Sequence, residues 1–312
     1  MKLIVIENTR SCVLKCECCP TVVAKSYPGG FMSMDVFYKV MDNVSSLYSN
    51  CVLSGWGEPF LDKNYFDKLS YLKAKGFKVG STTNLLLLNK DIFEKLNSTG
   101  LDQLNVSLDF FHLRSAGVSL REMRNTIYDL LDLYVSHFFT FNVQFNVVIT
   151  KSTVNNLSQI LSLLLPYAEI IGQVNIMPLI MIPKEKLLLE LLSKKELLDI
   201  KRNTIKKFKK LKCFFDYLED KLVNNCRSNI FNNVYVTYTG QVAPCCMLAM
   251  EFPNYTFNHE HGYMHPVYFG DLTKTDLKTI WDSRPYQNFR ETFAKGKIPN
   301  CCIACNVWRV LP

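Results

Sequence analysis

The sequence predicts an α/β fold, either a partial or full βα barrel or an open doubly wound sheet. Six short apolar runs alternate with helical patterns along the first 180 residues. Strands that alternate with helices in this way pair in parallel through right-handed crossovers. In each arrangement the ligand chemistry lies at the carboxyl ends of the strands. A cysteine-rich loop directly follows the first predicted strand, so it lies on the face where a site is expected.

The predicted elements follow one another regularly along this part of the chain. We expect strands at 3–7, 51–54, 77–82, 103–108, 140–149 and 169–177. We expect helices from the N-cap Ser33 towards Tyr48 and at 62–75, 89–97, 119–136 and 153–165. Gly76, Gly100 and Pro166 close several of these helices, because glycine and proline commonly stand at or just after a helix end.

Past Pro183 the pattern changes. Two Lys-rich helices are predicted up to Asn225, and their charge fits the solvated face of an amphipathic helix. A β-hairpin is predicted over 234–243 with Thr239-Gly240 at its turn, and short helices follow near 275–282 and 286–295. We therefore divide the chain into a core domain (1–180), a helical linker (181–222) and a small α+β domain (223–312).

Composition excludes several classes of protein. With 48% apolar residues the chain can build a sizeable core, and its net charge of +8 is moderate. Aromatic residues do not interleave with the lysines, which argues against nucleic-acid binding. Neither a signal peptide nor an uncharged apolar run of about eighteen residues is present, so we expect a cytoplasmic protein without a membrane partner. Twelve cysteines in a reducing compartment indicate metal binding.

The first cysteine cluster has the spacing Cys12-x3-Cys16-x2-Cys19. Three thiolates on one short loop can hold three irons of a [4Fe–4S] cube and leave the fourth iron open to an outside chelator. An open metal position distinguishes a catalytic site from a closed structural one. The alternative is a zinc site that a ligand from elsewhere in the chain completes.

This spacing, directly after a first strand, resembles the radical SAM superfamily. The resemblance implies a partial (β/α)6 TIM-like barrel in which Cys12, Cys16 and Cys19 hold a [4Fe–4S] cluster and the open iron binds S-adenosylmethionine. In that family reductive cleavage of S-adenosylmethionine yields a 5′-deoxyadenosyl radical, which takes hydrogen from the substrate. Cys18 stands where the family usually has a bulky apolar residue, which leaves a spare thiol beside the cluster.

Further motifs follow in the family's order. Trp56-Gly57-Glu58-Pro59, after the second strand, looks like the family's Gly-Gly-Glu-Pro motif, a loop that can contact the methionine amino group. By the same resemblance Asn84, after the third strand, belongs to the cofactor site, and Ser107 and Asp109, after the fourth, are candidates for binding the ribose hydroxyls. Loop hydrogen bonding or helix capping explains Ser107 and Asp109 equally well.

The second cysteine cluster resembles the SPASM and twitch extensions of radical SAM enzymes. Cys226 is followed by thirteen residues, Gly240, four residues and Cys245, and the chain ends soon after Cys302-x2-Cys305. The resemblance implies that these four cysteines hold one auxiliary [4Fe–4S] cluster. Cys246 and Cys301 each neighbour one of these ligands and are alternatives to it. The same thiols could instead form a structural zinc knuckle.

The resemblance implies an oxidoreductase or maturase that abstracts hydrogen from a substrate carbon, with the auxiliary cluster assisting oxidation or modification. The substrate is a peptide or a natural-product intermediate, and a dehydrogenase of a sugar-like molecule is the alternative. A thiol such as Cys18 or Cys246 could return hydrogen, and a reductase with flavodoxin or ferredoxin would supply electrons. The competing functional class is a non-catalytic protein, either an electron carrier or a structural zinc protein. A third class is an RNA-modifying enzyme.

Overall fold

The computed structural model describes residues 2–24, 29–44, 48–218 and 226–311. Within these ranges ten strands form one sheet in the order β12-β9-β8-β1-β2-β3-β4-β5-β6-β7. The strands of this sheet are β1 (Leu3–Ile6), β2 (Asn50–Leu53), β3 (Lys78–Thr83), β4 (Gln103–Ser107), β5 (Asn142–Ile149), β6 (Ile171–Pro178), β7 (Cys213–Phe215), β8 (Asn233–Val236), β9 (Gln241–Ala243) and β12 (Gly270–Asp271). β1 to β7 pair in parallel with their neighbours, which confirms the predicted partial βα barrel.

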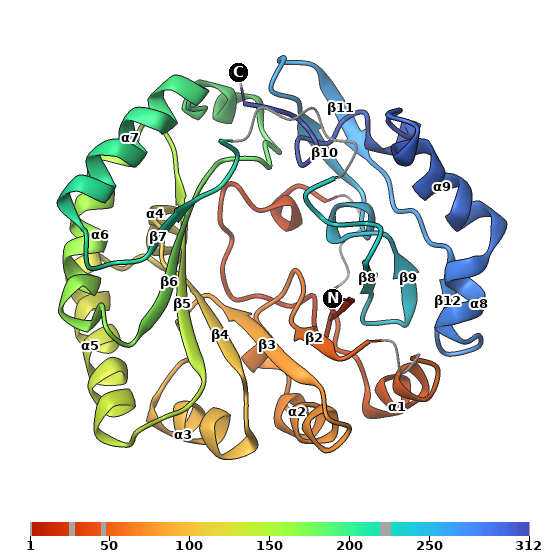
Figure 1. Cartoon of the computed structure of the whole chain (residues 1–312), viewed down its shortest axis with the longest axis horizontal. Helices are drawn as coiled ribbons and strands as arrows, with labels where there is room; N and C mark the ends of the chain where they lie inside the picture. The colour runs from red at the N-terminus through yellow and green to blue at the C-terminus, as the bar shows by residue number, and fades with distance from the viewer. Residues whose placement is uncertain (1, 25–28, 45–47, 219–225, 312) are drawn as a thin grey trace.

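Helices cover the outer side of the curved sheet, as Figure 1 shows for α2, α3, α5, α6 and α7. The helices are α1 (Met34–Asp42), α2 (Tyr65–Ala74), α3 (Lys90–Thr99), α4 (Phe110–Ala116), α5 (Leu120–Ser136), α6 (Leu157–Leu164), α7 (Lys194–Lys207), α8 (Leu277–Asp282) and α9 (Arg284–Ala294). Strand side chains alternate between this helical layer and the interior. In β5, Val143, Phe145 and Val147 are buried in the core, whereas Asn146 faces the cavity described below.

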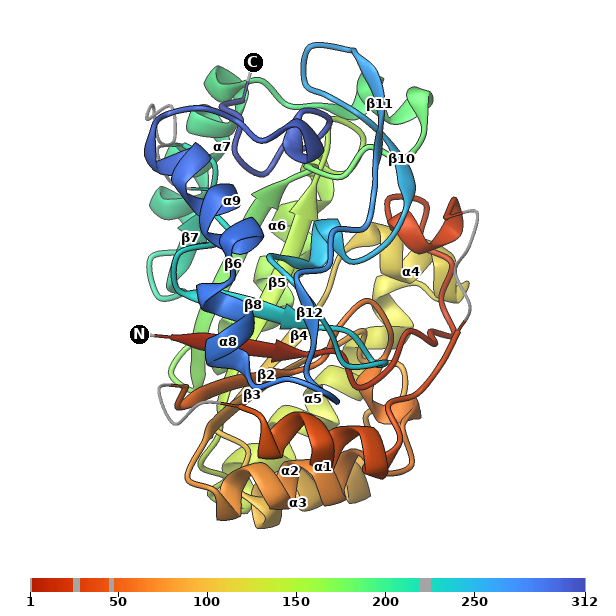
Figure 2. The same ribbon diagram turned by 90° about the vertical axis from the view of Figure 1, so that its right-hand side faces the viewer.

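The predicted hairpin is confirmed as β8 and β9, which pair antiparallel across a turn where Gly240 has φ +90°. Its position was not anticipated. β8 also pairs in parallel with β1, so the C-terminal segment extends the sheet of the core. A second hairpin, β10 (Phe252–Tyr255) with β11 (His261–Met264), was not predicted either. Figure 2 shows it at the same end of the molecule as the loop that follows β1.

Three other predictions differ from the structure. The first helix ends at Asp42, and residues 45–47 of its predicted span lie outside the described residues. The short helix α4 was missed, although the N-cap Asp109 and Gly117, with φ +69°, mark its two ends. The second Lys-rich helix was wrong where the structure describes it: Cys213–Phe215 forms β7 on the edge of β6, because pairing with an open sheet edge outweighs local helix preference. Residues 219–225 of that prediction lie outside the described residues.

Helices in the described ranges lack the length and hydropathy that crossing a bilayer would require.

Candidate functional site

The loop after β1 is held at both ends by hydrogen bonds. The Thr9 hydroxyl donates to the carbonyl of Gly30 (2.8 Å) and accepts from the Ser11 N–H (2.9 Å). From the loop after β2, the Gly57 N–H donates to the Thr9 carbonyl (3.1 Å). A Cβ atom at Gly57 would lie 2.5 Å from the carbonyl oxygen of Ser11, so only glycine allows this approach. The two loops therefore form one rigid unit.

Cys12, Cys16 and Cys19 line one cavity of about 300 Å³ at the carboxyl ends of the core strands. Asn84 Nδ2 lies 3.5 Å from Cys12 Sγ, and Thr21 Oγ1 lies 3.1 Å from Cys19 Sγ. Burial raises the pKa of all three thiols, that of Cys16 to about 12. The thiols are therefore protonated in the absence of a metal, and binding iron has to displace their protons.

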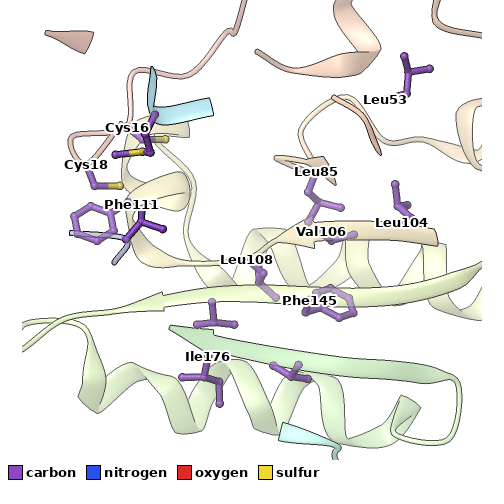
Figure 3. Close-up of a cluster of buried hydrophobic side chains, with 14 of the residues drawn as sticks. Cys16, Cys18, Leu53, Leu85, Leu104, Val106, Leu108, Phe111, Phe145 and Ile176 are labelled. Carbon is purple, nitrogen blue, oxygen red and sulfur yellow. The ribbon is translucent and has the colours of Figure 1, made fainter. Parts of the chain in front are cut away.

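Cys18 lies in the same cavity wall but is more deeply buried. Only 8% of the residue is exposed, and burial raises the pKa of its thiol well above the ordinary value. Figure 3 shows Cys16 and Cys18 beside Phe111 of α4 at one end of a buried cluster. Cys18 is thus a neutral thiol with apolar neighbours, next to the three cysteines of the motif.

Polar side chains from the ends of β3, β4 and β5 also line this cavity. Asn84, Ser107, Asp109 and Asn146 line it, together with His112. The Asp109 carboxylate caps α4 by accepting from the N–H groups of Phe111 (2.9 Å) and His112 (3.1 Å). Asp109 therefore both caps the helix and faces the cavity, so its predicted roles in helix capping and in binding the ribose hydroxyls are compatible.

His112 is a site residue that sequence reasoning missed. Its Nδ1 lies 2.8 Å from Asp109 Oδ1. Burial opposes the charge of the ring, but the charge and hydrogen bond of Asp109, with a contribution from Glu58, leave the pKa of His112 raised. The sequence signal was the spacing of a helix N-cap and a residue three positions later, which share one end of a helix.

The residues of the loop after β2 divide between the cavity and the core. Trp56 and Gly57 line the cavity. Glu58 and Pro59 do not, since Glu58 is 2% exposed and Pro59 begins a short 3-10 helix. The Glu58 carboxylate accepts from the Thr83 hydroxyl (2.8 Å) and the Asn84 N–H (2.8 Å). It therefore holds the loop after β3 in place and supports Asn84.

A second cavity of about 480 Å³ lies next to the first. Both cavities share six lining residues: Gly55, Trp56, Thr82, Met177, Ile180 and Met181. Beyond this shared boundary the second cavity is lined by Cys245, Cys246 and Met247 from the C-terminal segment. Trp56 ties the two sites together, because its Nε1–H donates to the Cys246 carbonyl (3.1 Å).

Six thiols of the C-terminal segment converge although they come from three stretches of chain: Cys226, Cys245, Cys246, Cys301, Cys302 and Cys305. After burial, the strongest effects on the pKa of Cys245 come from the charges of Cys246, Cys226 and Cys305, and all raise it. The pKa of Cys302 is also raised, first by its contact with Cys301, whose Sγ lies 4.0 Å away. The charges of these thiols act on one another, but among the described residues no three His, Cys, Asp or Glu side chains are grouped as they would be around a single metal ion.

The residues present fit the groups that the motifs imply. The first cavity is lined by three thiols and by polar side chains, beside backbone that tolerates only glycine at residue 57. Its volume lies at the lower end of the range of small-molecule sites. The C-terminal thiols exceed the four that one cubane needs. In the type and number of their donors, both sets of thiols suit iron–sulfur clusters.

An incomplete parallel barrel with one thiol triad at its strand ends, followed by a second thiol cluster, defines a class of iron–sulfur enzymes. Comparison with family models agrees: residues 6–164 match the radical SAM superfamily, and residues 226–306 match SPASM, an iron–sulfur cluster-binding domain. The chain therefore belongs to the radical SAM superfamily. That family holds a [4Fe–4S] cluster and S-adenosylmethionine, and the SPASM domain holds auxiliary iron–sulfur clusters.

Two curated relatives illustrate the range of the family. The chain is 24% identical to a tungsten-containing aldehyde ferredoxin oxidoreductase cofactor-modifying protein of Pyrococcus furiosus, over 96% of this chain and 86% of the relative. It is 32% identical to an AdoMet-dependent heme synthase of Methanosarcina barkeri, over 35% of this chain and 31% of the relative.

Solved structures share the fold at low sequence identity. The anSMEcpe enzyme with bound AdoMet superimposes with a TM-score of 0.68 at 15% identity, covering 99% of this chain and 84% of that one. SuiB of Streptococcus suis bound to S-adenosylmethionine gives 0.67 at 15% identity, covering 99% and 71%. BtrN in complex with AdoMet and 2-DOIA gives 0.55 at 17% identity, covering 95% and 88%.

Proposed function

We propose that this enzyme modifies a peptide, removing hydrogen from an apolar side chain that lies in the second cavity. When bound, the cluster and S-adenosylmethionine supply a 5′-deoxyadenosyl radical at the first cavity. Cys12, Cys16 and Cys19 would hold that cluster, and Asn84, Ser107 and Asp109 would orient the nucleoside.

The boundary between the two cavities carries the proposal. The reacting C–H group has to lie there, since a hydrogen atom is transferred only between groups in contact. Trp56, Met177, Ile180 and Met181 make this boundary apolar, and Thr82 contributes its one hydroxyl group. These apolar walls favour an apolar carbon as the group that lies at the boundary.

A sugar-like substrate fits this boundary less well. Each hydroxyl of a sugar loses its hydrogen bonds to water when it is buried, and an unpaired buried polar group costs about 1–3 kcal/mol. The methionine and isoleucine side chains offer no such partner. Peptides also appear with two structural neighbours, SuiB bound to the precursor peptide SuiA and anSMEcpe bound to the Cp18Cys peptide, which supports a peptide substrate.

We further propose that Cys226, Cys245, Cys302 and Cys305 hold one auxiliary [4Fe–4S] cluster and that a flavodoxin or ferredoxin supplies the electrons. Cys302 and Cys305 belong to one turn, in which the Trp308 Nε1–H donates to the Cys302 carbonyl (2.7 Å) and the Val307 N–H to Cys305 Sγ (3.4 Å). Cys246 lines the second cavity and is the thiol best placed to return hydrogen to a substrate.

Deuterium transfer tests the peptide proposal. The reconstituted enzyme is incubated anaerobically with S-adenosylmethionine, a reductant and fractionated extract from source cells. One culture receives deuterated leucine, isoleucine and valine, and a second receives deuterated glucose in an amino-acid-rich medium. We expect deuterium in 5′-deoxyadenosine only from the first culture, in a fraction that protease destroys. Deuterium from the glucose culture alone, or from a protease-resistant fraction, would show that the substrate is not a peptide.

A further inference from the structure

The second cavity has a polar end that the proposed chemistry does not use. β7 lies at an edge of the sheet and does not pair with β8. Asp216 and Tyr217 directly follow β7, and Arg227 and Ser228 precede β8, and all four line the second cavity. The seam between these two strands is therefore bridged by side chains where a closed barrel would have strand pairing.

Arg227 is held firmly in this seam. Its Nη1 donates to the carbonyls of Arg309 (2.9 Å) and Val307 (3.2 Å), and its guanidinium lies 4.1 Å from the centre of the Tyr217 ring. Tyr217 has φ +64°, an unusual value for a residue with a side chain, and its N–H donates to Asp216 Oδ1 (2.7 Å). Arg227 Nε lies 3.9 Å from the same carboxylate oxygen.

Both side chains retain hydrogen-bonding capacity. Within the described residues, Asp216 Oδ2 accepts from no protein donor and Arg227 Nη2 donates to no protein acceptor. The two opposite charges largely cancel, so the pair attracts neither a lone anion nor a lone cation strongly. It offers an acceptor and a donor side by side, which is the complement of a neutral group with one donor and one acceptor.

We propose that Asp216 and Arg227 bind a primary carboxamide of the substrate, such as an Asn or Gln side chain, whose N–H donates to the carboxylate and whose carbonyl accepts from the guanidinium. A trans peptide bond does not fit, because its N–H and carbonyl point in opposite directions. This inference rests on the proposed function, because it identifies the part of a peptide that enters the second cavity. A substrate carboxylate would be attracted by Arg227 but repelled by Asp216. A substrate ammonium group would be attracted by Asp216 but repelled by Arg227. A carboxamide satisfies both the half-exposed carboxylate of Asp216 and the more deeply buried guanidinium of Arg227.

The remaining wall supports an aliphatic neighbour for that amide. Val234, Met247 and Val307 line the same cavity, together with polar residues such as Ser228 and Asn233, and the three apolar side chains offer contacts for an aliphatic group. The site thus fits a peptide segment whose Asn or Gln carboxamide is bound at the seam and whose aliphatic neighbour extends to the boundary with the first cavity.

Three probes that differ only in their polar head test the pair: 4-methylpentanamide, 4-methylpentanoate and 4-methylpentylamine. Their binding to the reconstituted enzyme is measured by anaerobic equilibrium dialysis with S-adenosylmethionine present. We expect the carboxamide to bind about tenfold tighter than the other two, the factor that one additional charge-assisted hydrogen bond provides. Met181→Trp, which fills the boundary, should abolish binding of all three and so locate them in the cavity.

Asp216→Ala should reverse the order, because only the guanidinium then remains and the carboxylate becomes the tightest probe. Asp216→Asn should retain an intermediate preference for the carboxamide. Asp199→Ala, which removes a half-exposed carboxylate from α7, is the matched control and should leave all three affinities unchanged. Equal affinities for the three heads, or an unchanged order in Asp216→Ala, would refute the role of the pair.

The two proposals can fail separately. If deuterium is transferred from the peptide while the three heads bind equally, the amide assignment fails and the peptide proposal stands. Lumazine presents the same donor–acceptor edge without an aliphatic body. If lumazine binds tighter than 4-methylpentanamide, Asp216 and Arg227 bind a flat heterocycle. That result would refute the proposal that the bound amide belongs to a peptide.

Discussion

The two thiol sites differ in how the chain assembles them. Cys12, Cys16 and Cys19 belong to one loop of eight residues, and their cavity lies directly at the strand ends. The C-terminal site gathers six thiols from stretches of chain that begin at Cys226, Cys245 and Cys301. The first site therefore depends on local geometry, and the second depends on how β8, β9 and the last residues pack together.

The largest expected effect comes from the first site. Replacing Cys12, Cys16 and Cys19 with alanine removes every protein ligand of that cluster, so release of 5′-deoxyadenosine should stop and the iron content should fall by about four per chain. Cys51→Ala is the control, because Cys51 is a buried thiol of β2 that lines neither cavity. Unchanged iron in the triple variant would remove the basis of the comparison.

The second site should respond to two neighbouring substitutions differently. Cys302→Ala should lose about four irons and stop product formation while the first cluster still cleaves S-adenosylmethionine. Cys301→Ala should retain its iron, since we assign Cys302 as the ligand. Iron analysis and electron paramagnetic resonance of the two variants decide the matter. If Cys301→Ala loses iron and Cys302→Ala keeps it, Cys301 is the ligand. If neither variant loses iron, one of the excess thiols takes the place of the missing ligand.

Backbone contact at the first site gives a smaller effect. Gly57→Ala would force its Cβ against the carbonyl oxygens of Ser11 and Thr9, so the loop must shift. Overpacking of this kind costs about 1–3 kcal/mol, and we expect binding of S-adenosylmethionine to weaken about tenfold. Gly80→Ala is the matched control, because its Cβ would find ordinary contacts at 3.7 Å. Equal affinities in the two variants would contradict the rigid-loop interpretation.

The smallest expected effect is a pH-dependent change in stability at the first site, which the second cavity should not show. The folded-state pKa of His112 is raised, so the stabilisation from its ion pair with Asp109 is fully present below the unfolded pKa of about 6.5 and is lost as pH rises through the folded value. His112→Gln should lower the melting temperature by roughly 2 °C at pH 6 and by less at pH 9.

His137→Gln, which replaces an exposed histidine at the end of α5, is the control substitution. A constant difference between wild type and His112→Gln across this range would mean that the ring is not charged. No histidine is among the described residues that line the second cavity, so that cavity should lack this pH dependence.

Predictions from sequence succeeded where neighbouring residues decide the outcome. The order of β1 to β6 followed from local patterns, and so did the β8–β9 turn at Gly240. They failed where distant pairing decides: Cys213–Phe215 became a strand because β6 offered a free edge, and β8 joined β1 across more than two hundred residues. Glu58 belongs to the predicted motif, yet its carboxylate is buried against Thr83 and Asn84, which no local pattern indicates.

The sequence by itself determined the family and the first thiol triad, because ligands a few residues apart on one loop are brought together by the chain itself. Only the tertiary structure decided that two cavities share the boundary at Trp56 and that Asp216 meets Arg227 across the seam. These contacts depend on the packing of the whole sheet, and spacing along the chain does not by itself specify them.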